Sequence, residues 1–333
     1  MSTDPPIRIR PMDDADVPAV VRLLDETLGP APGGVDRLEL FEWKHLRNPF
    51  GRSIALVAEA DGAVVALRAL MRWRLAGAAG ARALAVVRAV DTATAPTMQR
   101  RGVFSRLTRE ALNACDAEGV AMVFNTPNDR SRPGYLKMGW QVVAAWPLWV
   151  RPRRPDRLAG AALRHDLRAG AGVAPPPTSS LIPAGQALSA ERAPRGLEPE
   201  ALHTARSLEY LRWRYAEGPL PYHVLSRGGA TVIARLRSRG RLREVVVCEA
   251  LASDGARPDL RELLRILPRE AGADHAVAHF GAGWPGRDEL RRAGYIRLPR
   301  AGITFTVRPV SPSEPDPLRA TSWSLTLGDL EVF

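Results

Sequence analysis

The sequence predicts a two-domain α/β protein in which each half holds a mixed, mostly antiparallel twisted sheet flanked by helices. Two observations lead to this prediction. Apolar runs typical of strands alternate with amphipathic patterns typical of helices, which indicates layered α/β packing. The chain has 333 residues, more than one domain usually contains, and three short patterns recur in its second half in the same order. We therefore expect two related domains.

The first half predicts strands and helices in a definite order. A strand is expected at 7–10 and a helix at about 15–28, where apolar residues recur at helical spacing. Two apolar runs, 54–60 and 64–73, flank Asp61-Gly62, a dipeptide that favours a tight hairpin turn. The elements expected next are a strand at 83–94, a helix marked by Val103, Leu107, Ala111 and Cys115, and a buried strand at 120–125.

Three patterns of the first half return in the second. They are Trp43-Lys44-His45 with Pro49 against Trp213-Arg214-Tyr215 with Pro219, the hairpin at Asp61-Gly62 against Gly228-Gly229, and Lys137-Met138-Gly139-Trp140 against Arg292-Ala293-Gly294-Tyr295. Between the copies, a segment rich in Pro, Ala and Gly loses the periodicity and is expected to be a linker. We therefore divide the chain into a first domain at 1–150, a linker at 151–199, a second domain at 200–310 and a tail at 311–333.

The composition limits the classes of partner. The chain carries 47 basic and 36 acidic side chains, a formal net charge of +11, and Lys44 and Lys137 are its only lysines. The arginines are spread through every segment, whereas nucleic-acid binding needs a clustered basic face. We therefore expect no nucleic-acid partner, although a basic surface attracts an anionic cofactor over long range.

Neither a membrane protein nor a metal protein is expected. No apolar run approaches the ~18 residues that span a bilayer, and the start lacks the apolar core of a signal peptide, so we expect a cytoplasmic protein. Cys115 and Cys248 are expected to be lone buried thiols. His275 and His279 alternate along an expected strand without a third ligand, which disfavours a metal site. The oligomeric state stays open, a homo-oligomer included.

Residues 90–112 are the most informative stretch of the chain. An expected strand leads through a proline turn into a loop with two arginines and Gly102, which opens directly into a helix. The first amides of a helix have no partner within the helix, so this order of elements makes an anion cradle. Gly102 lets a diphosphate approach the backbone. The alternative is an exposed turn before a surface helix.

The loop carries the residues of a family signature. The GCN5-related N-acetyltransferase (GNAT) family has the pattern Q/R-x-x-G-x-G/A, which stands here as Gln99-Arg100-Arg101-Gly102-Val103-Phe104. The first half therefore resembles that family, which moves an acetyl group from acetyl-CoA to an amine. Phe104 departs from the small residue of the signature. This large residue and the tandem arrangement are similar to the enhanced intracellular survival acetyltransferases. The second half resembles the family only as a degenerate repeat, because its connection SDGARP has no arginine-rich glycine loop.

The resemblance implies a set of site residues. Those implied for cofactor binding are Arg100, Arg101, Gly102, Val103, Phe104 and Ser105 around the diphosphate, and Thr92, Ala93 and Thr94 along the pantetheine arm. Asn125 is either a ligand of the cofactor's amide groups or the start of a turn. Tyr135 takes the place of the catalytic acid that protonates the leaving thiolate, or packs as a core residue against Trp140.

The general base stays open. The candidates are Asp91, Glu59, Glu42, His45 and, from the enhanced intracellular survival group, the terminal carboxylate of Phe333. We expect direct attack by the primary amine of a small-molecule acceptor, since Cys115 falls on a helix away from the loop. The alternative is a non-catalytic CoA-binding or interaction protein with this fold. Acceptor identity and acyl chain preference are not predicted.

Overall fold

The computed structural model describes residues 6–77, 82–164, 169–189, 199–281, 284 and 287–330. The first-half strands are β1 (Arg8–Pro11), β2 (Ile54–Ala60), β3 (Ala63–Ala76), β4 (Leu84–Thr94), β5 (Met122–Asn125) and β6 (Gln141–Pro152). The later ones are β7 (Ala169–Gly172), β8 (Ile182–Pro183), β9 (His203–Thr204), β10 (His223–Arg227), β11 (Ala230–Arg239), β12 (Leu242–Ala252), β13 (His275–Ala278) and β14 (Ile296–Pro309).

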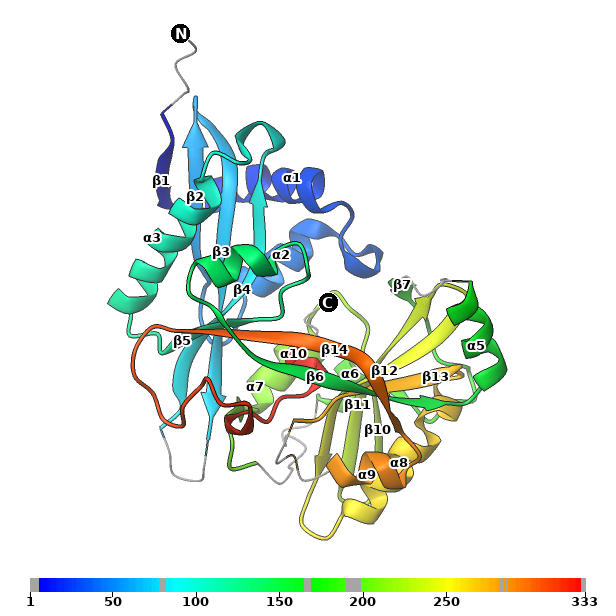
Figure 1. Ribbon diagram of the computed structural model, residues 1–333. Helices are drawn as coiled ribbons and strands as arrows, with labels where there is room; N and C mark the ends of the chain where they lie inside the picture. Colours follow the sequence, from blue (N-terminus) through cyan, green and yellow to red (C-terminus); the bar gives the residue numbers. More distant parts are fainter. Residues whose placement is uncertain are drawn as a thin grey trace.

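These strands form one mixed sheet of 14 strands that runs through both halves (Figure 1). Its order is β1-β2-β3-β4-β5-β14-β6-β13-β12-β11-β10-β8, with β7 beside β11 and β9 beside β3. Among the described strands, only β4 with β5 and β12 with β13 pair in parallel. The predicted mixed, mostly antiparallel α/β class is confirmed.

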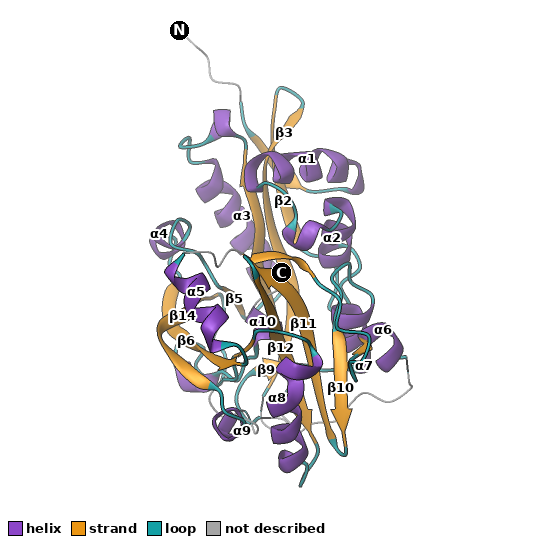
Figure 2. Ribbon diagram, turned by 90° about the vertical axis from the view of Figure 1, so that its right-hand side faces the viewer, coloured by secondary structure: helices purple, strands orange, loops and turns teal. Residues whose placement is uncertain are grey.

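The first half is layered. The helices α1 (Val17–Leu28) and α2 (Arg37–His45) cover one face of β2 and β3, and α3 (Val103–Ala117) covers the other, as Figure 2 shows. The predicted stripe on α3 is buried against the sheet, and its members are Val103, Leu107, Ala111 and Cys115. Asp61 and Gly62 have φ values of 51° and 75°, as the predicted hairpin turn requires.

The second half repeats this layered arrangement with fewer helices on its sheet. The expected hairpin at Gly228-Gly229 joins β10 and β11, and β12 and α8 (Arg257–Glu270) follow it. Leu260, Leu263 and Leu267 of α8 are buried on that sheet. A short helix α9 (Arg287–Arg292) precedes β14.

The last strand of each half crosses to the other half. β6 pairs with β13, where Val150 faces Val277, and β14 pairs with β5, where Val307 faces Phe124. The two crossing strands also pair with each other (Figure 1). The prediction of a separate sheet in each half is therefore replaced by one shared sheet. Crossing satisfies the open edges of β5 and β13, whose backbone groups otherwise lack partners.

The repeated tryptophans meet where the halves join. Trp43 lies in the last turn of α2, and Trp213 lies in the short π-helix Arg212–Ala216. Each indole Nε1 donates to the other residue's carbonyl, at 2.7 Å from Trp43 and 3.0 Å from Trp213, and the rings stack with centroids 4.8 Å apart. Gly139 and Gly294, with φ of 91° and 85°, occupy equivalent turns before β6 and β14. The repeated patterns therefore mark equivalent places in the two halves.

The expected linker contains short regular elements. The helices α5 (Pro155–Leu163) and α6 (Ala184–Ala187) lie in it together with β7 and β8. Arg153 N donates to the carbonyl of Asp274 at 2.8 Å, and Arg157 pairs with the carboxylate of the same residue at 2.8 Å. The segment is thus tied to the second half. Residues 165–168 of the linker lie outside the described residues.

Residues 322–330 of the tail are buried. Its last described helix, α10 (Leu327–Leu330), follows residues that bond to β13's end, with Gly281 N donating to Leu325 O at 2.8 Å. Arg206, which follows β9, binds Glu249 of β12 at 2.9 Å and Asp329 at 3.0 Å, and all three side chains are buried. Burial and the nearby Asp329 carboxylate raise the pKa of Glu249 to about 7 despite Arg206. The buried ion pairs of Arg206 with Glu249 and Asp329 thus hold α10 in place.

We predict that Trp213→Ala lowers the free energy of unfolding by about 3–5 kcal/mol, the usual cost of truncating a large buried aromatic side chain. The variant loses the stacked ring and the donor to Trp43. Chemical denaturation followed by circular dichroism measures the change. Leu163→Ala, at a side chain that is 82 % exposed, is the control and should cost under about 0.5 kcal/mol. Equal losses in the two variants would contradict the importance of this contact.

We also predict that Glu249 makes the fold less stable as the pH rises from about 4.5 to about 7. Its folded pKa is about 7 against an ordinary 4.5, so the folded state binds the proton more tightly in that window and loses roughly 3 kcal/mol across it. Denaturation of wild type and Glu249→Gln at pH 5 and 7.5 measures the slope. The variant should lack this component, whereas Glu110→Gln, at an exposed site on α3, should keep it. Parallel slopes in all three proteins would refute the assignment.

Candidate functional site

The strands β4 and β5 part in the middle of the sheet. Their parallel ladder holds only two residue pairs, Val87 with Val123 and Arg88 with Phe124. β5 ends one residue later, at Asn125, while β4 continues to Thr94. In the described chain no strand pairs with β4 on that side beyond Arg88, although β3 still pairs on the other side. The edge that carries Thr92, Ala93 and Thr94 can therefore accept an extended ligand.

A β-bulge interrupts β4 at this opening. Thr92 faces Arg68 of β3 and Val90 faces Ala69, so Asp91 is the extra residue, and its φ is 40°. Bulges redirect side chains. The Asp91 carboxylate meets α2, on one face of the sheet, whereas the Thr92 hydroxyl meets Arg68 on the other. Consecutive residues thus serve opposite sides of the opening.

The glycine loop lies where β4 leads into α3. Gly102 is the N-cap of α3 with φ of 74°, and Arg100 also has a positive φ of 61°. The first helical bond runs from Arg106 N to Gly102 O at 3.0 Å, so the amides of 103–105 precede the ladder. A Cβ on Gly102 would meet nothing within 4 Å. The need for glycine therefore comes from its backbone angle, and the space beyond the helix end is open.

Side chains around the loop differ in exposure. Arg100 and Ser105 are exposed, Arg101 is half-buried with Nη1 3.0 Å from Met98 Sδ, and Val103 is buried in the core. The Phe104 ring meets the Tyr135 ring edge-on, with centroids 6.0 Å apart. Phe104, which stands where the family signature has a small residue, therefore packs beside Tyr135.

Tyr135 is buried on the short helix α4 (Arg132–Lys137). Its hydroxyl oxygen accepts a hydrogen bond from Arg68 Nη1 at 2.8 Å, and its ring packs against Trp140 at 5.1 Å. The two alternatives for this residue are compatible, because the ring packs in the core while the hydroxyl stays in a polar cluster. Arg68 was not predicted. The sequence held one signal for Arg68, because this basic residue alternates with the apolar Ala66 and Leu70 and so lies on the same, buried face of the strand.

Asn125 is buried at the end of β5. Its side-chain oxygen accepts a hydrogen bond from the Thr306 hydroxyl of β14. This contact holds the end of the first half's strand to the crossing strand. The amide oxygen is thereby engaged, and cofactor binding by Asn125 stays a prediction.

The candidate bases do not all lie together. Asp91 and His45 meet, with His45 Nε2 2.8 Å from Asp91 Oδ2, and Lys44 Nζ contacts the same oxygen. Glu59 is held by Arg10 of the outer strand β1 at 3.0 Å, and Glu42 of α2 takes no part in the Asp91 cluster. Phe333 lies outside the described residues. The structure therefore brings two of the five candidates together and adds Lys44, which was not predicted.

The Asp91 cluster is buried and charged. Burial acts to raise the pKa of Asp91, but the charge of Lys44 and the hydrogen bond from His45 outweigh it and lower that pKa. Burial lowers the pKa of Lys44 and of His45. His45 Nδ1 also meets Ser53 Oγ at 2.8 Å. Asp91 therefore stays ionised at neutral pH and is suited to holding a cation more than to taking a proton.

The end of the described chain lies beside the opening. Arg88, the last residue of β4 that pairs with β5, donates to the carbonyls of Asp329 and Leu330 and, at 3.2 Å, to Thr126 Oγ1. Residues 331–333 continue from this point in the sequence. Arg88 was not singled out from the sequence, because an arginine within a strand gives no hint of a partner 241 residues away.

The second half fills its equivalent opening with protein. β12 and β13 pair in parallel from Glu244 to Val247, and the tail then takes the space, with Gly328 packed against Cys248 O and Glu249. A side chain at position 328 has no room there. This agrees with the absence of a glycine loop before α8 and leaves the β4–β5 opening as the candidate cofactor site.

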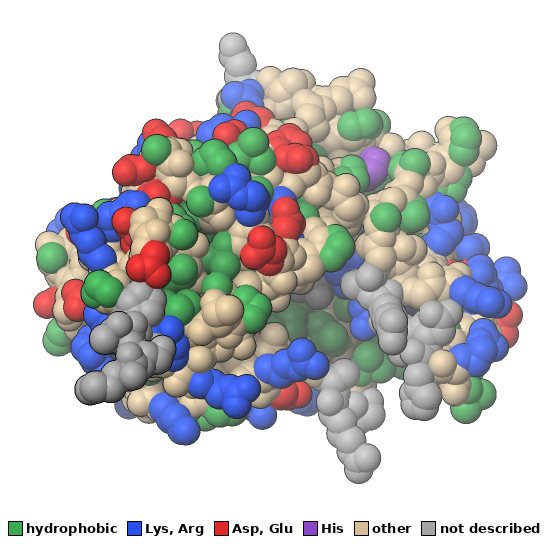
Figure 3. Space-filling model, turned by 90° about the horizontal axis from the view of Figure 1, so that it is seen from above, with side chains coloured by type: hydrophobic (Ala, Val, Ile, Leu, Met, Phe, Trp, Pro, Cys, Tyr) green, Lys and Arg blue, Asp and Glu red, His purple; other side chains and the backbone are tan. Residues whose placement is uncertain are grey.

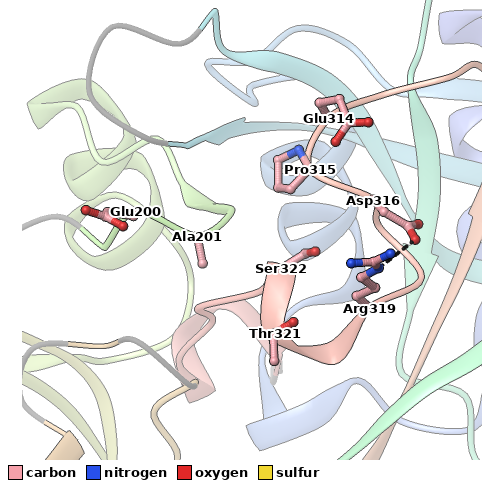
Figure 4. Close-up of a pocket in the computed structure, with 8 residues that line it drawn as sticks. All are labelled: Glu200, Ala201, Glu314, Pro315, Asp316, Arg319, Thr321 and Ser322. Atoms are coloured by element: carbon pink, nitrogen blue, oxygen red, sulfur yellow. Dashed lines mark ion pairs between the residues drawn. The ribbon is translucent and has the colours of Figure 1, made fainter.

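A surface pocket lies elsewhere. It has a volume of about 750 Å³ and lies between the start of the second half and the tail (Figure 4). Its lining residues are Glu200, Ala201, Glu314, Pro315, Asp316, Arg319, Thr321 and Ser322. None of them is a predicted site residue. The candidate site is instead the edge of β4 that β5 leaves unpaired, with which an extended ligand could pair.

The surface charge and the helices of the described ranges do not single out a class of partner. Acidic and basic side chains intermingle over much of the face in Figure 3, and basic ones gather toward one end of it. Each helix in the described ranges is too short or too polar to traverse a lipid bilayer. The described His, Cys, Asp and Glu side chains nowhere gather in a group of three or more that suits a metal ion.

Comparisons with known proteins agree with this geometry. Residues 8–143 match the model of the acetyltransferase (GNAT) domain. Eis1 from Mycobacterium abscessus is similar with a TM-score of 0.55 and 17% identity, over 92% of this chain and 74% of that chain. For a GCN5-related N-acetyltransferase from Kribbella flavida the values are 0.56, 15%, 92% and 72%, and for one from Anabaena variabilis 0.58, 11%, 96% and 85%.

Among curated proteins, the chain finds no match. The likeness to the three solved structures shows the tandem fold over most of the chain, and the domain match assigns its first part. Residues 8–143 therefore form a domain of the GNAT acetyltransferase family, within a chain that has the tandem fold of Eis1.

Proposed function

We propose that this protein moves an acetyl group from acetyl-CoA to the primary amine of a small molecule by direct attack. The observation that carries the proposal is the unpaired edge of β4 leading into the open N-terminus of α3. An extended arm can pair with the edge, and a diphosphate can bind the helix end. Acetyltransferase activity is what the GNAT domain suggests in general, and the amine acceptor is the finer part of the proposal.

The residues of the loop and strand fit this co-substrate. Amides of 103–105 donate to the diphosphate, and Arg100 and Arg101 add charge near it. The pantetheine arm lies along Thr92, Ala93 and Thr94. Gln99 Nε2 donates to Thr94 O at 3.1 Å, so this exposed side chain moves or shares the carbonyl on binding. Acetyl-CoA supplies an activated acetyl thioester, and the residues of the protein position it.

The two faces of the opening divide the chemistry. Tyr135, on the α3 side, donates a proton to sulfur as the carbon–sulfur bond breaks. The acceptor amine approaches from the α2 side, where Asp91 attracts its positive charge before it loses a proton. His45 is the proposed proton acceptor, because the Asp91 carboxylate is already engaged by Lys44.

Direct transfer is favoured over a covalent acetyl-enzyme. Cys115 is fully buried on α3, and burial raises the pKa of its thiol to about 12. A nucleophilic cysteine needs an accessible, easily ionised thiol. Cys115 has neither property, which supports attack by the acceptor amine itself.

A second candidate is a CoA-binding protein without catalysis. The observation that favours it is the Phe104 ring, which stands where the family signature has a small residue and closes on Tyr135. In this reading the cofactor binds but the phenol is screened from sulfur. Activity assays separate the two candidates.

We predict that Gly102→Val raises the dissociation constant of CoA at least tenfold. A β-branched residue is strained at a φ of 74°, so the loop shifts and its amides no longer converge. Isothermal calorimetry measures the affinity. Gly119→Val is the matched control, because Gly119 has a φ of 69°, equally open surroundings and a place just beyond the other end of α3. Equal affinities for the two variants would count against the loop as the diphosphate site.

We predict that Tyr135→Phe lowers the rate of CoA release from acetyl-CoA by about 10²-fold or more, within the range of general acid catalysis. A thiol-release assay with a panel of amines measures kcat, and calorimetry should show CoA affinity within threefold of wild type. Tyr295→Phe, at a buried tyrosine of the second half, should keep full activity. Tight CoA binding by wild type without release for any amine would favour the non-catalytic candidate.

A further inference from the structure

Arg68 is a buried cation at the centre of the first half. Its relative exposure is 0%, and it lies on β3 opposite Thr92 of the bulged strand. The guanidinium carbon is 5.5 Å from the centroid of the Phe104 ring and 5.2 Å from that of the Tyr135 ring. Two aromatic faces therefore enclose the charge and screen it from water.

The hydrogen bonds of Arg68 are one-sided. Nη1 donates to Tyr135 Oη at 2.8 Å and to Thr92 Oγ1 at 2.6 Å. Nε and Nη2 are buried without any partner, and within the described ranges no carboxylate pairs with this arginine. An unpaired buried cation is costly, and an apolar residue of similar size would pack there at a lower cost. A purely structural role therefore explains Arg68 poorly.

We propose that Arg68 is a positioning residue that sets the direction of the Tyr135 proton and stabilises the phenolate left after its transfer. This inference rests on the proposed function. A guanidinium only donates, so the Tyr135 oxygen must accept from Arg68 and its own hydrogen must point to a different acceptor. In the bound state that acceptor is the sulfur of CoA.

The step balances without a further reactant. The amine nitrogen forms a bond to the acetyl carbon, the carbon–sulfur bond breaks, and sulfur takes the Tyr135 proton. The proton that the amine loses passes to the base and, through solvent, back to Tyr135. During the step a negative charge moves to the tyrosine oxygen, 2.8 Å from Arg68 Nη1, inside a dry cluster where such charges interact strongly.

The same arrangement gives Phe104 a purpose. Its ring lies over the guanidinium and edge-on to the phenol, which keeps water from both. The departure from the small residue of the family signature is therefore matched to the arginine on β3. A small residue at position 104 would admit water and weaken the interaction of Arg68 with the developing phenolate.

The test compares wild type with Arg68→Met, Arg68→Lys, Tyr135→Phe and the double variant Arg68→Met/Tyr135→Phe. Thiol release gives kcat and KM for acetyl-CoA. We expect Arg68→Met to lower kcat at least tenfold with KM within threefold, and Arg68→Lys to recover part of the loss. The double variant should be no slower than Tyr135→Phe, because Arg68 acts through Tyr135. Arg235→Met, at a buried arginine of β11, should retain kcat.

A second readout needs no turnover. Calorimetry with CoA at pH 7 and 9.5 spans the ordinary pKa of a thiol, about 8.5. Wild type should bind CoA more tightly at the higher pH, because the thiolate accepts the hydrogen bond of a phenol backed by a cation. Arg68→Met should lose this gain, while its affinity at pH 7 stays within threefold. Should Arg68→Met fail to fold, Arg68→Lys carries both readouts, with a partial loss expected.

The outcomes separate the inference from the proposed function. If wild type fails to bind CoA at either pH, the proposed function falls and this inference falls with it. If wild type binds CoA, but Arg68→Met keeps the pH gain or its effect on kcat adds in full to that of Tyr135→Phe, the inference alone is overturned. The readout at two pH values applies even if no amine in the panel is accepted.

Discussion

The separation of β4 from β5 after two residue pairs is the constraint on which the rest of the site depends. A parallel sheet normally continues its ladder, and here the bulge at Asp91 and the early end of β5 leave a backbone edge unpaired inside the molecule. Such an edge needs a partner. In the proposed function that partner is an extended cofactor, whose diphosphate would bind the open amides of α3 and whose thioester would lie beside Tyr135.

The two halves hold this opening in place together. β14 reaches from the second half to pair with β5, and β6 reaches back to β13, so backbone ladders join the two halves. The Trp43–Trp213 pair and the buried ion pairs that hold α10 add contacts on the α2 side. In the second half, the equivalent opening is occupied by the tail, whose last described residue, Leu330, bonds to Arg88 beside the first opening. In the proposed function, the second half therefore supports a single site in the first half.

Local sequence patterns predicted most of the helices and strands. They did not predict which distant strands and side chains meet. Asp61-Gly62 set a hairpin, the apolar stripe of α3 set a helix, and the motif around Gly102 located the loop, because each signal lies within a few residues. Strand crossing could not be read, since periodicity shows which residues form a strand but not which strand lies next to it. Arg68 and Arg88 were missed for a related reason. An arginine in a strand resembles a solvent-facing residue until its partners, Tyr135 and the tail, are brought near by the fold.

A crystal structure of the protein with acetyl-CoA is the most direct test of the account. We expect density for the diphosphate at the amides of 103–105, the pantetheine arm along Thr92 to Thr94, and sulfur within hydrogen-bonding distance of the Tyr135 hydroxyl. Cofactor density in the second half or at the surface pocket, with the β4–β5 opening left unoccupied, would contradict the central claim.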